Sequence, residues 1–405
     1  MQILYFYQHF TTPTGMTGTR AYEMARYLVD SGHGVTMVCG SCGTSDTGLT
    51  TPFIRARREG MVEGIRVIEF GLPYSNRDGF TRRIWTFMKY ALRSVGVALK
   101  EDYDVVFATS TPLTASLPGI AASWLRRKPF VFEVRDLWPE LPRAMGVIKN
   151  PIILAAMSIL EWVSYRSARR CIGLAPGIVA GIGKHINPNH VTLVPNGADL
   201  DIFDPHADSR WRPSEINDSD FLAVYTGTHG TANGLDAVLD AASVLKKMGR
   251  ANIKLLLIGE GKLKARLVDR ATTEGLTNVV FHDSVSKYRI ADLLRSADVG
   301  MQILANVPAF YYGTSPNKFF DYVAAGLPVL NNYPGWVASL IDEHRCGKAV
   351  TPENPQAFAE ALVEMADNPA MLESMGRAAR KLAETQFSRP VLAAAFTRVL
   401  EAAVK

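Results

Sequence analysis

Short apolar runs alternate along most of the chain with longer segments whose apolar residues recur every three or four positions. The first such unit consists of an apolar run at 2–7, a helical pattern over 19–31 and a second apolar run at 35–39. Because strands that alternate with helices form parallel sheets covered on both faces, the pattern predicts an α/β fold. Further strands are expected at 65–70, 105–108, 130–134, 171–174 and 191–194.

The alternation lapses over 204–220, a polar stretch with two prolines, and then begins again. A chain of 405 residues with 47% hydrophobic content can bury two cores, so we expect two Rossmann-like domains. The first should comprise 1–203 plus a closing helix within 389–405, and the second 204–388, with the linker at 204–220. In the second domain we expect strands at 222–226, 253–259 and 279–282 and helices over 235–248 and 263–274.

Cysteine use and the longest uncharged stretch bear on the cellular setting. The four cysteines are too few and too scattered for a disulfide framework, so a reducing, cytoplasmic setting is expected. The first ten residues lack the charged region of a signal peptide and are predicted to form a strand. The uncharged stretch 105–125 contains Pro112 and Pro118, which favours a strand, a loop and a helix start over a membrane span. Any membrane contact is therefore expected to be peripheral.

Charge is unevenly distributed, although the net charge is only +5. Residues 1–200 contain 22 Lys plus Arg against 15 Asp plus Glu, and the remainder contain 22 against 24. The segment 80–100 combines five basic residues with Trp85 and other apolar side chains, a composition typical of contact with an anionic bilayer surface. An ordinary amphipathic helix packed on the sheet is the alternative. A nucleic-acid partner is not expected.

The segment 313–329 contains the most informative motif. Ser315 is a candidate N-cap and Pro316 stands at the favoured first position of a helix. A helix that starts there would direct free N–H groups toward an anion, and Lys318 would add a positive charge. A diphosphate is the natural ligand. Asn317 also lies in this first turn, and Asp321, one turn further on, could accept hydrogen bonds from a ribose diol.

This segment resembles the donor-binding signature of the retaining glycosyltransferase family 4, which has the GT-B fold. In that signature two acids eight positions apart precede an Ala-x-Gly-x-Pro-Val turn. Asp321 matches the second acid, which the resemblance implies binds the ribose, whereas the first acid falls on Gly313. Bacterial O-antigen and capsule transferases of the N-acetylfucosamine type are the similar subgroup. The resemblance implies two parallel-sheet domains that face a central cleft.

Other segments of the second half extend the resemblance to nearly the whole chain. The stretch 194–199 is similar to the family's interdomain hinge, and 294–299 to the step before the donor motif. The turns at 225–230 and 258–261 and the strand end at 278–283 are similar to the family's nucleotide-binding segments. The resemblance therefore implies donor-binding roles for Gly227 and His282. The Arg and Lys that many family members carry before Gly-Leu-Asp are absent here, so His229 and one of Lys262 or Lys264 are expected to bind the phosphates instead.

In the first half, a glycine-rich loop follows the first strand and precedes a helix, so its backbone can approach a ligand closely. Gly15 and Gly18 are the implied donor contacts of this loop. The segment 132–140 is similar to a family segment that reads Val-His-Asp, and Arg135 stands in place of the histidine. The resemblance implies that Arg135 and Asp136, together with Lys262, are catalytic residues.

The resemblance implies a retaining, metal-independent enzyme that moves a sugar from a nucleoside diphosphate, with a UDP-sugar as the expected donor, to a glycan or polyprenyl-linked acceptor. No cofactor and no metal are expected. Asp102 and Asp104 have the spacing of a metal-binding Asp-x-Asp but precede an apolar strand, and Cys39 with Cys42 forms only half of a zinc-type site. Two alternatives stay open: a sugar-nucleotide 2-epimerase on the same fold, and a non-catalytic scaffold that binds a nucleotide-sugar.

Overall fold

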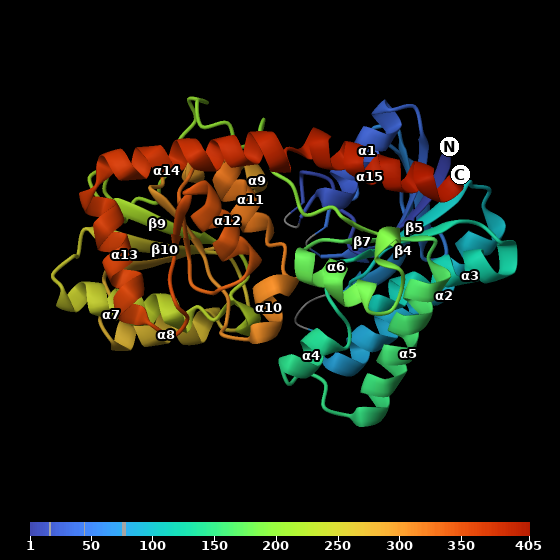
Figure 1. Ribbon diagram of the computed structural model, residues 1–405, viewed down its shortest axis with the longest axis horizontal. Coiled ribbons are helices and arrows are strands. Elements are labelled where there is room, and N and C mark those ends of the chain that lie inside the picture. Colours follow the sequence, from blue (N-terminus) through green and yellow to red (C-terminus); the bar gives the residue numbers. More distant parts are fainter. Residues whose placement is uncertain (16–17, 44, 75–77) are drawn as a thin grey trace. The chain divides into compact units, whose positions relative to one another are not determined.

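The computed structural model describes residues 1–15, 18–43, 45–74 and 78–405, which form two compact units (Figure 1). Each unit is a mostly or wholly parallel sheet covered by helices, so the predicted pair of Rossmann-like domains is confirmed. The first unit contains Met1–Asn196, Tyr312–Ser315 and Pro390–Lys405, and the second contains Gly197–Tyr311 and Pro316–Arg389.

The segment 197–203, which we expected in the first domain, belongs to the second unit. Ala198 pairs with Ser388 in a parallel bridge, and Arg380 donates hydrogen bonds to the carbonyl oxygens of Leu200 and Phe203. The polar stretch 204–220 also lies within the second unit, where the Trp211 amide donates to the Asp292 carbonyl at 3.1 Å. Residues 204–220 therefore pack on the surface of the second unit, and a backbone hydrogen bond from Trp211 helps to hold them there.

The sheet of the first unit has the order β3-β4-β2-β1-β5-β6-β7-β8. Every neighbouring pair is parallel except β3 with β4. The hydrophobic pattern missed β3 because this edge strand has the sequence Arg-Arg-Glu-Gly-Met-Val and exposes alternate side chains. The strands are β1 (Gln2–Phe6), β2 (Gly34–Cys42), β3 (Arg57–Val62), β4 (Ile65–Tyr74), β5 (Val105–Thr109), β6 (Phe130–Val134), β7 (Arg170–Gly173) and β8 (Val191–Leu193).

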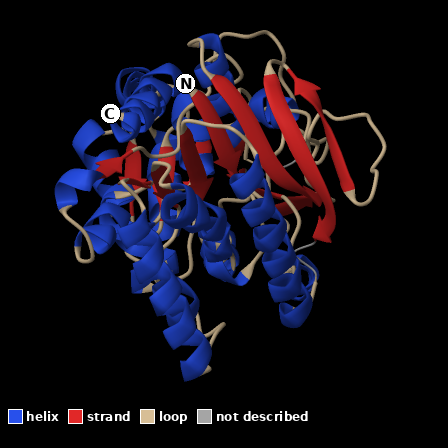
Figure 2. Cartoon of the chain, turned by 90° about the vertical axis from the view of Figure 1, so that its right-hand side faces the viewer, coloured by secondary structure: helices blue, strands red, loops and turns tan. Residues whose placement is uncertain are grey.

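Helices lie on both sides of these strands, as Figure 2 shows. The stretch 105–125 forms β5, a 3₁₀ turn and most of α3 (Leu117–Arg126), as predicted. None of the helices among the described residues is long and apolar enough to span a membrane. The closing helix α15 (Arg389–Val404) packs Phe396 against Phe107 with ring centroids 4.8 Å apart. The other helices are α1 (Arg20–Asp30), α2 (Phe80–Lys100), α3 (Leu117–Arg126), α4 (Glu140–Ala144), α5 (Pro151–Ser167) and α6 (Pro176–Gly183).

The sheet of the second unit is parallel throughout, with the order β11-β10-β9-β12-β13-β14. Its strands are β9 (Phe221–Thr226), β10 (Ile253–Ile258), β11 (Val279–His282), β12 (Val299–Gln302), β13 (Val329–Asn331) and β14 (Gly347–Ala349). Its helices are α7 (Asp236–Lys247), α8 (Lys264–Thr273), α9 (Lys287–Leu294), α10 (Pro308–Gly313), α11 (Asn317–Ala324), α12 (Trp336–His344), α13 (Pro355–Asp367) and α14 (Pro369–Leu382). The last two residues of α10 are assigned to the first unit.

The register of the second sheet brings the predicted donor residues to one edge. Thr226 on β9 pairs with Ile258 on β10, which pairs with His282 on β11, so three strands end side by side. In open parallel sheets, ligands bind beyond the carboxyl ends of the strands. The turns that begin at Gly227 and Gly259 lie at this edge.

Candidate functional site

The helix α11 begins one residue later than predicted, and Ser315 is not its cap. The helix starts at Asn317 with Pro316 as N-cap residue and without a side-chain cap. The Ser315 hydroxyl instead accepts a hydrogen bond from the Asn196 amide at 3.0 Å, and the Asn196 side chain donates to the Ser315 carbonyl at 2.5 Å, both within the first unit. Asn317 is exposed. The first turn of α11 therefore keeps N–H groups that no side-chain cap occupies.

Lys318 reaches from the first turn of α11 to the turn after β9. Its ammonium lies 5.1 Å from the centroid of the Tyr225 ring, and its Cε lies 3.1 Å from the place that a Cβ on Gly227 would occupy. In the part of the chain that the structure describes, Lys318 forms no ion pair and donates no side-chain hydrogen bond. Burial lowers the pKa of Lys318 to about 8, and the nearby Asp321 only partly opposes this. The site thus contains a cation without a counter-ion.

Asp321 lies half-buried one turn further along α11. Burial raises the pKa of its carboxyl, whereas the charges of Lys287, Arg389 and Lys318 act in the opposite direction. Lys287 and Arg389 both pair with Asp199. Among the described residues, no side chain donates a hydrogen bond to Asp321. Asp199 is part of the hinge motif quoted above, but its two basic partners are far away in sequence and no local pattern identified them.

Close backbone packing shapes the two turns beside Lys318. Gly259 has φ +146°, and a Cβ there would lie 1.9 Å from the Gly227 carbonyl oxygen. A Cβ on Gly261 would lie 2.4 Å from the carbonyl oxygen of His229. The Gly227 amide donates to the Ile258 carbonyl at 2.9 Å. Only glycine fits at 259 and 261 without displacing the neighbouring backbone, so the two turns pack directly against each other.

The structure places His229 in the interior of the unit rather than at its surface. The residue is fully buried, and its ring lies 6.2 Å from the ring centroids of both Tyr225 and Phe281. Neither ring nitrogen has a hydrogen-bond partner among the described residues. Burial, aided by the charge of Lys264, lowers the pKa of His229 to about 4, so the ring is neutral at pH 7. The phosphate-binding role of His229 stays a prediction, and it requires the ring to turn outward.

The two lysines of the second turn differ in their partners. Lys264 pairs with Glu260 at 2.8 Å and with Asp283 at 2.5 Å. Although burial lowers the pKa of Lys264, these two hydrogen bonds raise it overall. Lys262 is exposed, and among the described residues no side chain pairs with it. Lys262 is therefore available to an anionic ligand, whereas Lys264 is already neutralised by carboxylates.

At the end of β11, His282 makes an edge-to-face contact with Trp211, with ring centroids 5.1 Å apart. Its Nδ1 lies 2.9 Å from the carbonyl oxygen of Asp283. The Arg289 guanidinium stacks on the Trp211 ring, 4.3 Å from its centroid. Sequence reasoning singled out His282 but not Trp211, because Trp211 stands alone in the irregular stretch 204–220. The contact was visible only in three dimensions.

In the first unit, the glycine-rich loop is partly described. A Cβ on Gly15 would lie 2.0 Å from the Thr11 hydroxyl oxygen and 3.0 Å from the Asp46 amide nitrogen, so the backbone passes closely here. Gly18 is exposed. The two residues between them, 16–17, lie outside the described residues. The donor-binding roles of Gly15 and Gly18 stay predictions.

Arg135 and Asp136 follow β6, at the carboxyl edge of the first sheet. The Arg135 amide donates to the Ser110 hydroxyl at 2.8 Å, and its guanidinium donates to the Tyr7 hydroxyl at 3.2 Å. Burial raises the pKa of Asp136, while Arg135 and a weak 3.5 Å hydrogen bond from Thr111 oppose the rise. These two residues are thus neighbours of opposite charge at the strand end. Their catalytic roles stay predictions.

An ion pair that sequence reasoning missed lies beside them. Arg20 donates two hydrogen bonds to one Glu133 oxygen, at 3.1 and 2.7 Å, and both side chains are buried. The same guanidinium donates to the carbonyl oxygens of Val194 and Pro195, while Thr109 donates to the other Glu133 oxygen at 2.8 Å. The available signal was a glutamate inside the apolar strand 130–134, which requires a buried partner.

No group of three His, Cys, Asp or Glu side chains with the geometry to hold a metal ion occurs among the described residues. Asp104 accepts a hydrogen bond from the Gln2 amide at 2.6 Å, and Asp102 lies 3.5 Å from Arg126. Cys39 is buried and Cys42 half-buried, and no disulfide bond occurs among the described residues. Asp102 and Asp104 therefore contribute to the strand entry and to a surface ion pair.

Family models match both halves of the chain. Residues 208–382 match the family described as Glycosyl transferases group 1, and residues 15–197 match Glycosyl transferase 4-like domain. The chain is 24% identical to a glycogen synthase of Mycobacterium tuberculosis, across 96% of this chain and 91% of that protein. It is 26% identical to the O-antigen chain mannosyltransferase C of Escherichia coli, across 44% of this chain and 45% of that protein.

Solved structures share the whole fold. Sucrose-phosphate synthase from Thermosynechococcus elongatus superposes with a TM-score of 0.76 at 17% identity, covering 99% of this chain and 98% of that one. HepE of Anabaena, solved in complex with UDP-glucose, superposes with a TM-score of 0.70 at 16% identity, covering 99% of this chain and 100% of that one. At such identities the likeness establishes the fold alone, and that fold is GT-B.

Proposed function

Since the chain is a GT-B glycosyltransferase whose second half matches the group 1 family, we propose that it uses a UDP-sugar as donor. The acceptor in this proposal is a glycan or lipid-linked glycan of cell-surface polysaccharide synthesis, and the transferred residue is of the hexosyl or N-acetylhexosaminyl type. The observation that carries the donor assignment is Lys318 at the carboxyl edge of a parallel sheet, a desolvated cation that forms no ion pair with any described residue. A diphosphate would supply the missing negative charge.

The comparisons support this proposal from two sides. HepE was solved with UDP-glucose bound and has the same fold, and the relative from Escherichia coli is an O-antigen chain mannosyltransferase. The motif around Lys318 and Asp321 also resembles that of the O-antigen and capsule subgroup. These likenesses support a UDP-sugar as donor and a role in polysaccharide synthesis.

In the proposed reaction, the protein stabilises the departing UDP without a metal ion. The ammonium groups of Lys318 and Lys262 and the first N–H groups of α11 would bind the diphosphate oxygens on which negative charge accumulates. Asp321 would accept hydrogen bonds from the ribose. Anomeric retention would follow a same-face route in which the leaving phosphate takes the acceptor proton. Arg135 and Asp136 would then orient or polarise the reacting sugar.

The proposal also includes peripheral contact with an anionic membrane through α2, on the cytoplasmic face. In support, α2 contains five basic residues and no acidic residue, and it exposes Trp85, Leu92 and Leu99. Lipid-linked acceptors reside at such a surface, so a transferase that binds there meets its acceptor by lateral diffusion.

The placement of the ribose is tested by Asp321→Ala. Loss of a charge-assisted hydrogen bond to the ribose should weaken binding of free UDP by about 1–3 kcal/mol, measured by isothermal titration calorimetry. The matched control is Asp342→Ala, which removes an exposed carboxylate from α12 of the same unit and should leave affinity unchanged. Equal affinity in wild type and Asp321→Ala would refute the ribose assignment.

Transfer itself is tested by incubating the protein with radiolabelled UDP-sugars. A transferase hydrolyses its donor slowly or labels a lipid-linked acceptor in a membrane extract. A 2-epimerase would interconvert the sugar without acceptor, and a scaffold would leave every donor intact. Failure of hydrolysis and transfer with all common UDP-, GDP- and ADP-sugars would contradict the proposed function.

A further inference from the structure

Three of the six tryptophans are strongly exposed, and each lies on a different helix of the first unit. Trp85 on α2 is 61% exposed, Trp124 on α3 is 63% exposed and Trp162 on α5 is 47% exposed. The remaining tryptophans are half-buried. Exposed tryptophans are costly in water, and three on neighbouring helices indicate a surface that is covered in use.

The three helices are neighbours, because α3 contacts both α2 and α5 (Figure 1). On α2 the exposed residues Trp85, Leu92 and Leu99 recur every seven positions and so share one face. On α5, Ile152 and Ile159 have the same spacing and are 78% and 64% exposed. A helix packed only against its own sheet would be polar on this side. We call these exposed apolar residues, with Trp124 and the 70% exposed Leu125, the tryptophan face.

Basic groups accompany the tryptophan face. The Lys89 ammonium lies 5.2 Å from the Trp85 ring centroid, and the Arg166 guanidinium lies 4.9 Å from that of Trp162. Arg127 and Lys128 directly follow α3. The three helices contain a single acidic residue, Glu161, and its side chain is buried. Aromatic rings beside cations, with no exposed acid on the helices, match the headgroup region of an anionic bilayer.

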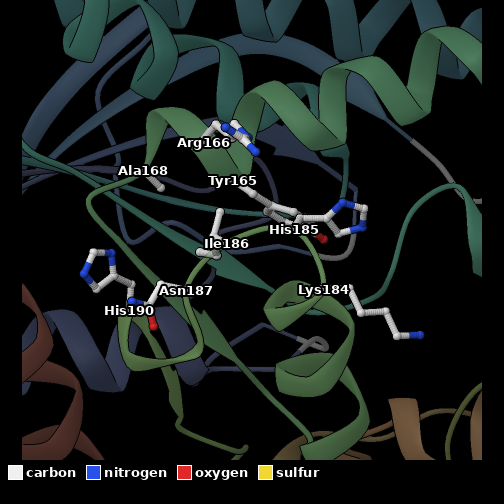
Figure 3. A pocket seen from close by; sticks show the side chains of 8 residues that line it. All are labelled: Tyr165, Arg166, Ala168, Lys184, His185, Ile186, Asn187 and His190. Atoms are coloured by element: carbon white, nitrogen blue, oxygen red, sulfur yellow. The ribbon is translucent and has the colours of Figure 1, made fainter.

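A basic cavity of about 450 Å³ adjoins the end of α5 (Figure 3). Arg166 lines it from α5, while Lys184, His185 and His190 line it from the loop beyond α6. A second cavity of about 360 Å³ shares Arg166 with it and adds further basic residues. Because Arg166 also stacks on Trp162, these cavities are continuous with the tryptophan face. The additional basic residues of the second cavity are Arg127, Lys128 and Arg169.

We propose that the tryptophan face docks the protein on an anionic lipid bilayer, with three tryptophans in the interface and a headgroup phosphate in the basic cavity at Arg166. This inference rests on the membrane contact of the proposed function, not on sugar transfer, and extends that contact from α2 to α3 and α5. A second copy of the chain is the less suitable occupant, because face-to-face packing would bring the same basic residues together.

The test is co-sedimentation of the full chain with two kinds of vesicle, one of phosphatidylcholine and one of equal parts phosphatidylcholine and phosphatidylglycerol. We expect binding to the anionic vesicles only, and weaker binding as salt is raised. The triple variant Trp85→Ser, Trp124→Ser, Trp162→Ser should reduce this binding at least tenfold. Arg166→Glu should reduce it as well. Tyr288→Ser, which removes a 57% exposed aromatic side chain from α9 of the second unit, is the matched control and should bind as the wild type does.

Several results would overturn the inference. They are absence of binding to either vesicle, equal binding by the triple variant, and a dimer in sedimentation velocity that the triple variant dissociates. The last would make the face a homodimer interface. Thermal unfolding and UDP titration of the triple variant show whether it is folded. Retained UDP binding with lost vesicle binding separates this inference from the proposed function, which fails only when donor binding and turnover fail.

Discussion

The carboxyl edges of the two sheets differ in how their charged side chains are partnered. In the first unit, Arg20 and Glu133 are 2% and 1% exposed and are paired with each other. Arg20 also donates hydrogen bonds to the carbonyl oxygens of Val194 and Pro195, and the Thr109 hydroxyl donates one to Glu133. In the second unit, Lys318 has lost much of its hydration, and no counter-ion among the described residues replaces it.

The difference separates charges that hold structure from charges that await a ligand. Desolvating an ion is unfavourable unless the fold supplies compensating groups. Arg20 and Glu133 are fully compensated, so their function is to fix α1, β6 and the segment that leads to Asn196. Lys318 lowers the stability of the unliganded protein, and a bound anion would remove that cost. A basic residue therefore stabilises the fold at the edge of the first sheet and destabilises it at the edge of the second.

Arg20→Ala is expected to have the largest effect on folding. The variant leaves Glu133 buried without its cation, and such a loss typically costs about 3–5 kcal/mol of unfolding free energy. The double variant Arg20→Met, Glu133→Leu removes both charges and should be considerably less destabilised. Urea unfolding followed by circular dichroism measures both. A loss below about 1 kcal/mol in Arg20→Ala would show that the pair is not structural.

Glu161 on α5 shows a third way to accommodate a buried charge, which is to protonate it. The residue is 9% exposed, and burial raises its pKa from 4.5 to about 7 although the Tyr165 hydroxyl donates to it at 2.8 Å. Since the folded pKa is raised, the folded state binds the extra proton between pH 4.5 and 7, and stability should fall as pH rises through that window. The loss by neutral pH is up to about 3 kcal/mol.

Glu161→Gln keeps an acceptor for Tyr165 and removes the titration, so its stability should depend less on pH across the same window. Glu373→Gln, which changes an exposed acid on α14, is the control and should keep the wild-type profile. Urea unfolding at a series of pH values measures the slope. If the unfolding free energies of wild type and Glu161→Gln changed in parallel with pH, Glu161 would not be protonated in the folded protein.

The hydrophobic pattern predicted the fold better than the contacts of the site. Apolar runs defined β6 and β11 to the residue. The strand β6 is fully buried and apolar at four of its five positions, and the half-buried edge strand β11 still carries three consecutive apolar side chains. The edge strand β3 was missed because its side chains are polar and exposed. Helix α11 was located by its motif, but the predicted N-cap role of Ser315 was wrong, because its hydroxyl contacts Asn196, 119 positions away in sequence.

The sequence also could not show which side chains of the site form ion pairs or pack together, because the partners are distant along the chain. Lys262 and Lys264 look equivalent in the chain, yet only Lys264 meets two carboxylates, one of them on Asp283. The predicted phosphate ligand His229 is buried, since its ring packs between Tyr225 and Phe281. Motifs thus predicted which segments gather at the edge, whereas side-chain direction depends on residues that are distant in sequence.

Lys318→Met tests whether Lys318, which forms no ion pair with a described residue, binds the ligand. We expect binding of UDP to weaken by about 2 kcal/mol, roughly 30-fold, because a charge-assisted hydrogen bond is lost. The unliganded variant should be at least as stable as the wild type at pH 7, in contrast to Arg20→Ala. Lys264→Met should weaken UDP binding less, since Lys264 is already paired. Calorimetry and urea unfolding give both quantities, and a destabilised Lys318→Met with unchanged UDP affinity would place Lys318 with Arg20 as a structural charge.

The smallest expected effect is the pH dependence of UDP binding. The pKa of Lys318 is lowered to about 8, so its charge is largely present at pH 7 and largely absent at pH 9. Because the diphosphate is already largely ionised at pH 7, affinity should fall about tenfold between these two pH values, as linkage requires when only the protonated lysine binds. In Lys318→Met the affinity should stay constant across the same range. A wild-type affinity that does not change with pH would mean that another group, such as Lys262, neutralises the diphosphate, and the contrast between the two sheet edges would then rest on Lys262 instead.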